Sequence, residues 1–134
     1  MKNKLIELCN NCYSPYFNFN VAAIITMKDG KEINGVNVEN ANGTSICAER
    51  TAIGNAVTQG YKKGDFKEIH ILSNSIDKII TPCFACRQVL LEFIELDAKV
   101  ICMSKSGEEK IFELKELCPH TFTSEDLNWI VVTV

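Results

Sequence analysis

Apolar and polar residues recur along this chain of 134 residues with two different periods, which predict helices and strands. Apolar side chains return at spacings of three and four in segments typical of amphipathic helices: 2–12, 47–59 and 82–94. Mostly apolar runs typical of buried strands occupy four other segments: 21–27, 32–38, 68–73 and 99–103. The pattern therefore predicts three helices and four strands.

Turn and capping residues set the expected limits of these elements. The Asp-Gly pair at 29–30 favours a tight turn, so the first two strands can form an antiparallel hairpin. Thr44 or Ser45 could cap the second helix, and Thr81 followed by Pro82 is typical of an N-cap and a first helical residue. The third helix is therefore expected to begin at Pro82.

The order of these elements predicts an α/β domain. A helix, two strands, a helix, a strand, a helix and a strand follow one another, and strands joined through a helix run parallel. We expect three layers around a mixed sheet, with residues 1–134 as a single domain, because the length suits one core and no linker interrupts it. The apolar run 129–134 could add an edge strand or cover a subunit contact.

Charge and hydropathy exclude several classes of function. The 14 Lys and Arg residues against 17 Asp and Glu residues give a net charge of −3, whereas proteins that bind long nucleic acids carry a basic excess. No apolar run approaches the roughly 18 to 20 residues of a membrane span, and the charged N-terminal segment is unlike a secretory signal. We therefore expect a cytoplasmic protein without a nucleic-acid or membrane partner.

The 7 cysteines favour metal binding or catalysis over disulfides in a chain of this kind. Cys83 and Cys86 form a Cys-x-x-Cys pair at one helix start and Cys47 lies at another, where backbone N–H groups and the helix dipole favour thiolates. Thiolates bind zinc, so three converging cysteines could hold one ion. The alternative is that they are ordinary buried cysteines, as we expect for Cys9 and Cys12 on the apolar face of the first helix.

Charged neighbours make the predicted metal site more specific. Glu49 lies two residues after Cys47, where it could act as a proton shuttle or simply interact with the helix dipole. The chain has two arginines, Arg50 and Arg87, and both follow candidate ligands. Their donors to thiolate sulfur atoms would offset the negative charge of a zinc ion held by three cysteines. The alternative is two surface arginines that form salt bridges.

These residues, with further segments, resemble the small homotetrameric cytidine deaminases. The matching segments cover most of the chain: Tyr13-Ser14-Pro15-Tyr16, Asn18-Phe19, Asn37-Val38-Glu39-Asn40-Ala41, Cys47 to Ile53, Pro82 to Gln88, Phe122, and Ser124 to Leu127. The resemblance implies a three-layer α/β/α fold with a mixed five-stranded sheet and one Zn²⁺ per subunit. It also implies hydrolytic deamination of cytidine and deoxycytidine in pyrimidine salvage.

The resemblance gives each residue of the zinc motifs a role. Cys47, Cys83 and Cys86 would bind zinc, with water or hydroxide in the open fourth position. Glu49 would take a proton from that water and protonate ring nitrogen N3 as hydroxide attacks C4. It would later deliver a proton to the departing ammonia, as in other zinc deaminases.

Five further residues are implied to bind the substrate. Asn37 and Glu39 would bind the ribose hydroxyls, and their spacing of two along a strand places both side chains on one face. Phe19 would pack near the pyrimidine, Ala48 would contact the substrate, and Phe122 would stack in the site of a neighbouring subunit. We therefore expect a homotetramer with shared active sites and a nucleoside as its small-molecule partner.

Departures from the family pattern leave alternatives open. The loop 42–46 is one residue shorter than usual and lacks an aromatic residue, as in blasticidin-type deaminases, so another aminated nucleoside could be the substrate. A fourth cysteine or His120 could instead complete a structural, non-catalytic zinc site. A polynucleotide substrate is disfavoured by the net charge. His70 and His120 are otherwise expected to be surface or capping residues.

Overall fold

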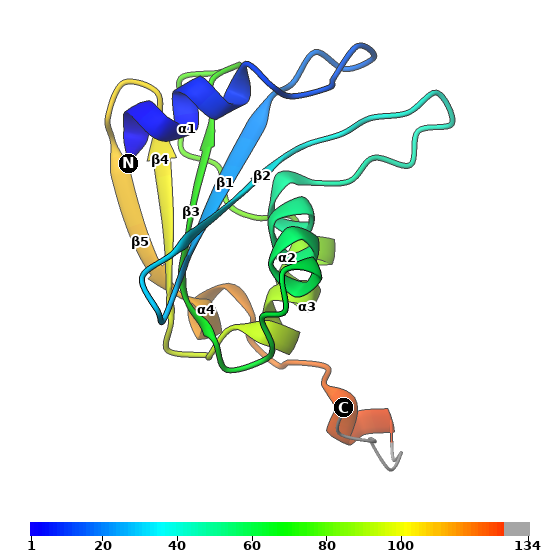
Figure 1. The fold of residues 1–134 in the computed structure, drawn as a ribbon, viewed down its shortest axis with the longest axis vertical. Coiled ribbons are helices and arrows are strands. Elements are labelled where there is room, and N and C mark those ends of the chain that lie inside the picture. The colour runs from blue at the N-terminus through cyan, green and yellow to red at the C-terminus, as the bar shows by residue number, and fades with distance from the viewer. Residues whose placement is uncertain (128–134) are drawn as a thin grey trace.

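The computed structural model describes residues 1–127, which form four α-helices, five strands and a short 3₁₀ helix (Figure 1). The elements follow in this order: α1 (Lys2–Cys9), β1 (Val21–Met27), β2 (Glu32–Val36), α2 (Ala48–Thr58), β3 (Phe66–Ser73), α3 (Phe84–Phe93), β4 (Lys99–Ser104), β5 (Glu109–Glu113), α4 (Leu114–Leu117) and η1 (Ser124–Leu127). The predicted succession of elements is confirmed as far as β4, and β1 has the predicted bounds.

The five strands form one mixed sheet in the order β2-β1-β3-β4-β5. β1 pairs antiparallel with both β2 and β3, and β4 pairs antiparallel with β5. β3 and β4, which α3 connects, are parallel, as the helical crossover predicted. The hairpin between β1 and β2 closes where the Asp-Gly pair was expected, and Gly30 there has a φ of +90°.

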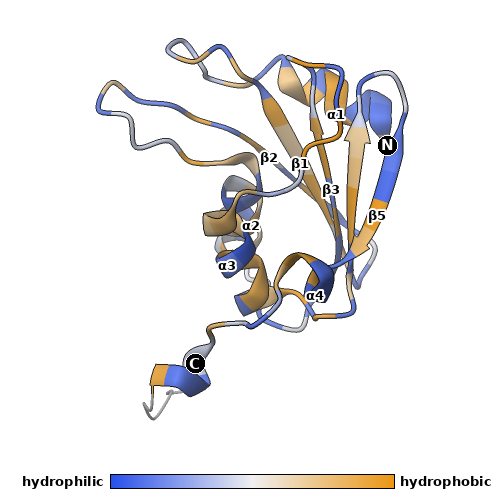
Figure 2. Cartoon of the chain, turned by 180° about the vertical axis from the view of Figure 1, so that it is seen from behind, coloured by the Kyte–Doolittle hydropathy of each residue, from blue (hydrophilic) through white to orange (hydrophobic). Residues whose placement is uncertain are grey.

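The two faces of the sheet are covered by different helices (Figures 1 and 2). Alternate residues of a strand point to opposite faces, so neighbouring positions of β1 enter different clusters. Ala23 and Ile25 belong to the larger core that α2 and α3 cover, whereas Ala22 and Ile24 pack with Leu5 of α1. The predicted three-layer α/β fold is therefore confirmed.

Helix α2 packs directly against the backbone of β2 at Gly35. Gly35 faces this helix, and a Cβ atom built at Gly35 would lie 2.3 Å from the carbonyl oxygen of Ala48 and 2.4 Å from the amide nitrogen of Ala52. No side chain fits between strand and helix at this point, so the backbone of β2 itself supports the first turns of α2. The absence of a side chain at Gly35, opposite Ala48 and Ala52, therefore determines how close the N-terminal turns of α2 lie to β2.

The two helices that carry the cysteine motifs begin at other residues than predicted. The N-cap residues are Cys47 for α2 and Cys83 for α3, each with an extended backbone, rather than Thr44 or Ser45 and Thr81. Neither cysteine makes a side-chain capping hydrogen bond of the Ser or Thr kind. In α3 the backbone N–H of Cys86 instead interacts with the Cys83 thiol.

Further differences concern the C-terminal end of helix α1 and the edge strand β5. Helix α1 ends at Cys9 instead of residue 12, because the amide groups of residues 10–12 donate to carbonyls only three residues back. The edge strand β5 was not predicted, since its charged residues (blue in Figure 2) hide the strand pattern and it pairs on one side only. The expected edge strand or subunit contact at 129–134 lies outside the described residues.

His70 is not the surface residue that was expected. It lies in the middle of β3, paired with Ile24 of β1 and Ile101 of β4, and its side chain is 12% exposed. Burial lowers the pKa of its imidazole, and the nearest carboxylate, of Glu68, is 4.0 Å away. The imidazole is therefore held in its neutral form by the surrounding sheet.

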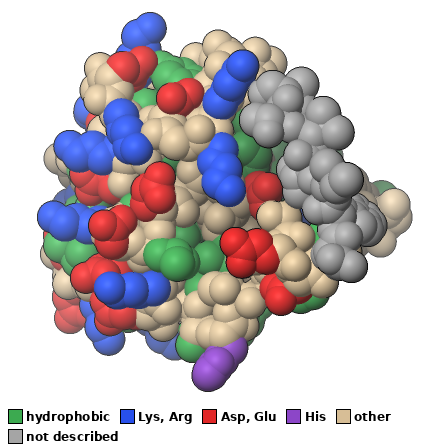
Figure 3. Space-filling view, turned by 90° about the horizontal axis from the view of Figure 1, so that it is seen from below, with side chains coloured by type: hydrophobic (Ala, Val, Ile, Leu, Met, Phe, Trp, Pro, Cys, Tyr) green, Lys and Arg blue, Asp and Glu red, His purple; other side chains and the backbone are tan. Residues whose placement is uncertain are grey.

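The surface carries charges of both signs. On the face drawn in Figure 3, Lys and Arg side chains alternate with Asp and Glu, and no continuous basic stripe crosses this face. Within residues 1–127, no helix has the length and apolar character that crossing a bilayer requires.

Candidate metal centre and active site

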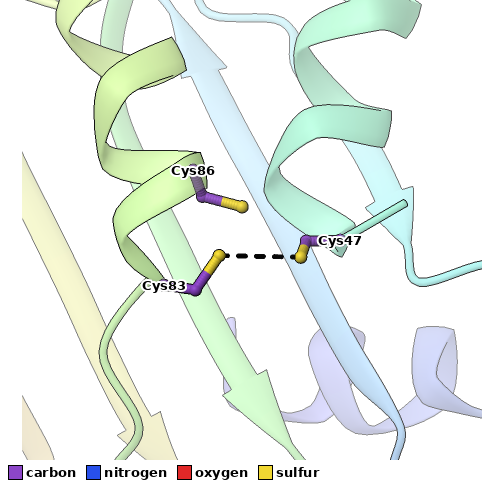
Figure 4. A group of neighbouring side chains, drawn as sticks. All are labelled: Cys47, Cys83 and Cys86. Atoms are coloured by element: carbon purple, nitrogen blue, oxygen red, sulfur yellow. Dashed lines mark hydrogen bonds between the residues drawn. The ribbon is translucent and has the colours of Figure 1, made fainter. Parts of the chain in front are cut away.

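Three cysteine side chains converge where helices α2 and α3 begin (Figure 4). Cys47 and Cys83 are the N-cap residues of these helices, and Cys86 lies in the first turn of α3. Their sulfur atoms all lie within 4.8 Å of one another, and the Sγ atoms of Cys47 and Cys83 are 3.7 Å apart. The structure thus brings together the three residues that the sequence singled out as ligands.

The spacing of the sulfur atoms fits a tetrahedral metal ion. Zinc–sulfur bonds of about 2.3 Å in a tetrahedron place sulfur atoms about 3.8 Å apart, close to the Cys47–Cys83 separation. Burial would raise the pKa of the Cys83 thiol, but the backbone N–H of Cys86 and the neighbouring thiols outweigh it and lower the pKa. Burial and the charge of Glu49 raise the pKa of Cys86. A cation among the three sulfur atoms would relieve their mutual repulsion as thiolates.

No fourth ligand joins this cluster among the residues that the structure describes. The group of metal-ligating side chains that lie close together contains the three cysteines alone, and His120 is not part of it. Structural zinc sites are closed by four protein ligands, whereas catalytic sites keep one position open. The arrangement therefore favours a catalytic site over the structural site that the sequence left open.

Glu49 lies in the first turn of α2, next to the sulfur cluster. Its side chain is buried, with the residue 5% exposed, yet it lines the same cavity as Cys47 and Cys83. Burial raises the pKa of its carboxyl group, against the opposing effects of its own backbone N–H, the Cys86 thiol and the charge of Arg50. Burial thus favours the protonated form of this carboxyl group, and the groups around it favour the charged form.

The two arginines have different partners. Arg50 donates from Nη2 to the Cys47 sulfur and to the Ser45 carbonyl, both at 3.4 Å, and the bond to sulfur raises its pKa. This is the contact predicted for it.

Arg87 does not make the predicted contact with a sulfur atom. Its guanidinium donates to the carbonyls of Pro82 (2.7 Å) and Leu117 (2.9 Å) and to the hydroxyl of Thr81 (3.1 Å). It also stacks over the ring of Phe84, with its Cζ atom 4.3 Å from the ring centre. Arg87 therefore fixes residues 81 and 82, which lead into α3, and through them it positions Cys83.

A cavity of about 470 Å³ opens beside the cysteines. Its volume suits a small molecule. The predicted residues in its wall are Phe19, Asn37, Glu39, Cys47, Ala48, Glu49 and Cys83. The sequence analysis missed the other lining residues, which are Phe17, Val21, Ser45, Ile46, Ile80 and Thr81. Each of these lies within three residues of a predicted one, and that proximity was the available signal.

Asn37 and Glu39 tie the cavity wall to the loop before β1. Asn37 donates from Nδ2 to the carbonyl of Phe19 (2.7 Å) and accepts the N–H of Val21 at Oδ1 (2.9 Å). Glu39 is buried and accepts the N–H groups of Tyr16 (2.9 Å) and Phe17 (3.2 Å) at a single oxygen, Oε1. Among residues 1–127, its other oxygen, Oε2, receives no hydrogen bond, so it can accept one from a ligand.

Phe122 lies away from this cavity. The residue is 56% exposed, and its carbonyl accepts a hydrogen bond from the Gln88 side chain at 2.8 Å. In Figure 1 the segment after α4 leads away from the sheet and its helices towards η1. Phe122 therefore contributes nothing to the cavity of its own chain.

Comparisons with known proteins point to one family. Residues 1–104 match the cytidine and deoxycytidylate deaminase zinc-binding region. A cytidine deaminase of Halalkalibacterium halodurans is 39% identical over 124 residues, covering 92% of each chain. A probable cytidine deaminase of Dictyostelium discoideum is 42% identical over 129 residues, covering 92% of this chain and 85% of that one. The crystal structure of the cytidine deaminase from Burkholderia pseudomallei superimposes with a TM-score of 0.82 at 35% identity, covering 91% of this chain and 99% of that chain.

Proposed function

The chain belongs to the family of cytidine and deoxycytidylate deaminases, and from this premise we propose how its own residues perform the reaction. It is a zinc-dependent cytidine deaminase, which converts cytidine and deoxycytidine to uridine and deoxyuridine with release of ammonia, a reaction of pyrimidine salvage. One observation carries the proposal: a cluster of three thiols without a fourth ligand in residues 1–127, with a buried carboxyl group beside it in the wall of a cavity.

Cys47, Cys83 and Cys86 would hold the zinc ion, because their sulfur spacing fits its tetrahedral coordination. When bound there, zinc would supply Lewis-acid chemistry by making a coordinated water more acidic and hence a better nucleophile. Arg50 withdraws charge from the Cys47 sulfur through its hydrogen bond. Without that donor, three thiolates would leave the centre negatively charged and the water less acidic.

Glu49 moves the protons of the reaction. Its carboxylate takes a proton from the attacking water and donates it to N3 of the pyrimidine, which makes C4 electrophilic. A second proton transfer through the same carboxyl group releases the amino group as ammonia. Burial raises the pKa of Glu49 and so favours the protonated form, which can hand its proton to N3.

The cavity provides a sugar end and a base end. Glu39 presents Oε2 to the ribose hydroxyls, while Oε1 is fixed by the N–H groups of Tyr16 and Phe17. The side-chain amide of Asn37 is fixed by two backbone groups, because its Oδ1 accepts the N–H of Val21 and its Nδ2 donates to the carbonyl of Phe19. The apolar ring of Phe19, which lines the cavity, would pack against the pyrimidine. Prior fixing of these groups lowers the entropy that substrate binding costs.

A second copy of the chain would complete the site. Phe17, Phe84 and Phe122 are 70%, 76% and 56% exposed, which leaves large apolar side chains without cover in one chain. We include in the proposal a homotetramer in which Phe122 stacks in the cavity of a neighbouring subunit. Light scattering of the zinc-loaded protein tests this part, and a monomer that turns over cytidine at full rate would contradict it.

The decisive experiment is a deamination assay on purified zinc-loaded protein. Loss of the ultraviolet absorbance of cytidine and release of ammonia are followed with cytidine, deoxycytidine and blasticidin S as separate substrates. We expect turnover of the first two. Turnover of blasticidin S alone would replace the proposed substrate, and the short loop 42–46 would then be the first place to look for the cause.

A pair of variants tests the role of Glu49. Glu49→Gln removes the proton-carrying group but keeps its shape, so we expect bound zinc with a loss in kcat of at least about 100-fold. Glu92→Gln makes the same chemical change at an exposed position of α3 and serves as the control. Near-normal activity of Glu49→Gln, or a cobalt-substituted protein whose spectrum requires four sulfur ligands, would refute the mechanism.

A further inference from the structure

Cys9 and Cys12 form a second Cys-x-x-Cys pair, which the deamination mechanism does not use. Both are free thiols, located where α1 ends. The amides of Asn10, Asn11 and Cys12 donate to the carbonyls of residues 7, 8 and 9, so the chain here follows a 3₁₀ path. In that conformation residues three apart are eclipsed, with Cα atoms about 6 Å apart, which lies within the range of disulfide-bonded cysteines.

The two thiols differ in exposure and in chemistry. Cys9 is 0% exposed and its sulfur faces the carbonyl of Leu72 at 3.8 Å. Cys12 is partly exposed, and its thiol donates to the carbonyl of Val21 at 3.2 Å. The neighbouring Cys9 thiol lowers the pKa of Cys12 to about 7, and the proximity of Cys12 together with burial raises the pKa of Cys9. Cys12 is therefore the accessible nucleophile and Cys9 the buried partner behind it.

We propose that Cys9 and Cys12 are a redox modification site, in which a low-molecular-weight disulfide such as oxidised glutathione converts the two thiols into an intramolecular disulfide. The Cys12 thiolate attacks one sulfur of the oxidant, forms a mixed disulfide and releases the first glutathione as a thiolate. Cys9 then loses its proton to that thiolate, attacks the Cys12 sulfur and releases the second glutathione. Two electrons pass from the protein to the oxidant, and an added dithiol reverses the change.

Backbone contacts connect this pair to the cavity wall. The residue after Cys12, Tyr13, donates to the carbonyl of Asn37 at 3.1 Å and accepts the N–H of Glu39 at 2.8 Å. Val21, whose carbonyl accepts the Cys12 thiol, donates in turn to the side chain of Asn37. Forming the disulfide takes the Cys12 sulfur away from Val21 and shifts the segment that braces both predicted ribose-binding residues.

The inferred effect on activity rests on the proposed function. Oxidation should raise KM for cytidine by about threefold to tenfold, the range expected when one hydrogen bond that supports the binding groups is lost. The kcat should stay unchanged, because the pair contacts neither Glu49 nor the three cysteines of the metal centre. A change in KM alone separates this coupling from damage to the metal centre.

The first test detects the disulfide without reference to activity. Zinc-loaded protein is treated with oxidised glutathione, digested with trypsin without reduction and analysed by mass spectrometry. Both cysteines fall in the single peptide 5–28, so their disulfide lowers its mass by two hydrogen atoms. Peptide 79–87 carries Cys83 and Cys86, and it should keep its thiols while the protein keeps its zinc. Unchanged thiols in peptide 5–28 would overturn the proposal.

Matched variants test the order of attack. The Cys9→Ser protein should stop at the mixed disulfide, so that its peptide 5–28 gains one glutathione. The same peptide of the Cys12→Ser protein should gain no glutathione. Cys118→Ser, which removes another partly exposed thiol far along the chain, should behave as the unsubstituted protein. Glutathione on Cys9 in the Cys12→Ser protein, or an unmodified Cys9→Ser protein, would refute the assignment of nucleophile and resolving thiol.

The second test measures kinetics before oxidation, after it and after reduction with dithiothreitol. A reversible rise in KM that the Cys12→Ser protein lacks supports the coupling, and an unchanged KM with the disulfide formed overturns it. A protein that is inactive before oxidation would count against the proposed function, while the peptide analysis would still decide whether the disulfide forms. The two failures are thus distinguishable.

Discussion

Substituting alanine for Gly35 should damage the metal centre from a distance. Gly35 lies in β2, and it does not line the cavity. The added Cβ would lie 2.3 Å from the Ala48 carbonyl oxygen, 2.4 Å from the Ala52 amide nitrogen and 2.8 Å from the Ala52 Cα. All three atoms belong to the backbone of α2, so no side-chain rotation can relieve the overlap.

The size of the effect follows from these distances. Ordinary contacts of a Cβ atom begin near 3.4 Å, so α2 must move away from the sheet by about 1 Å. Cys47 and Glu49 move with this helix, whereas Cys83 and Cys86 stay on α3. A displacement of about 1 Å can cost about 100-fold in rate, and overpacking of this kind costs about 1–3 kcal/mol of the free energy of unfolding. We therefore expect weaker zinc binding and a fall in kcat/KM of about 100-fold.

The assay compares Gly35→Ala with a matched change in the same helix. Gly54 belongs to α2, and a Cβ atom built there meets nothing within 4 Å. Gly54→Ala should raise the free energy of unfolding by about 0.5–1 kcal/mol and leave activity intact. Zinc content, kcat/KM and urea unfolding are measured for both variants. A Gly35→Ala protein with full zinc content and kcat/KM within twofold of the unsubstituted protein would refute this reasoning.

Three further substitutions test separate contacts. Arg50→Ala removes the donor to the Cys47 sulfur and should lower kcat about 10- to 100-fold with the fold retained, as measured by circular dichroism beside the deamination assay; unchanged kinetics would show that the thiolate charge is offset elsewhere. Glu39→Gln should raise KM for cytidine with little change in kcat, and an equal fall in kcat would place it nearer the reaction than proposed. His70 has a folded-state pKa below its ordinary 6.5, so its contribution to stability is present above pH 6.5 and is lost as the pH falls. Urea unfolding of His70→Gln should accordingly lose less stability between pH 7.5 and pH 5.5 than the unsubstituted protein, and identical losses would contradict the assigned burial effect.

The cysteine cluster of the candidate metal centre was predictable because the signal was local. Two cysteines three residues apart and a third cysteine with an acidic residue two positions later are visible in any reading of the sequence, and helix starts favour thiolates. The structure then supplied what spacing could not, namely that Cys47 and Cys83, 36 residues apart, lie with their sulfur atoms 3.7 Å from each other. The convergence depends on how α2 and α3 pack on the sheet.

Contacts over long sequence separations were beyond the reach of the sequence analysis. Arg87 was expected to reach a sulfur atom, but two carbonyl groups and a hydroxyl take its donors. One of these acceptors, Leu117, lies thirty residues further along the chain. The edge strand β5 escaped notice for a related reason, since its pairing with β4, rather than its own composition, makes it a strand.

The position of the cavity follows from the directions of three neighbouring strands. β1 is antiparallel to both β2 and β3, so the beginning of β1 and the ends of β2 and β3 meet at one edge of the sheet. The lining residues come from the segments attached to that edge: 17–21 at the start of β1, 37–49 after β2 and 80–83 after β3. Helices α2 and α3 begin there for the same reason, and their N-termini bring the thiols to the cavity. Substitutions in these three segments should therefore change substrate binding or catalysis, whereas those at the opposite edge, in 28–31 and 59–65, should change stability alone.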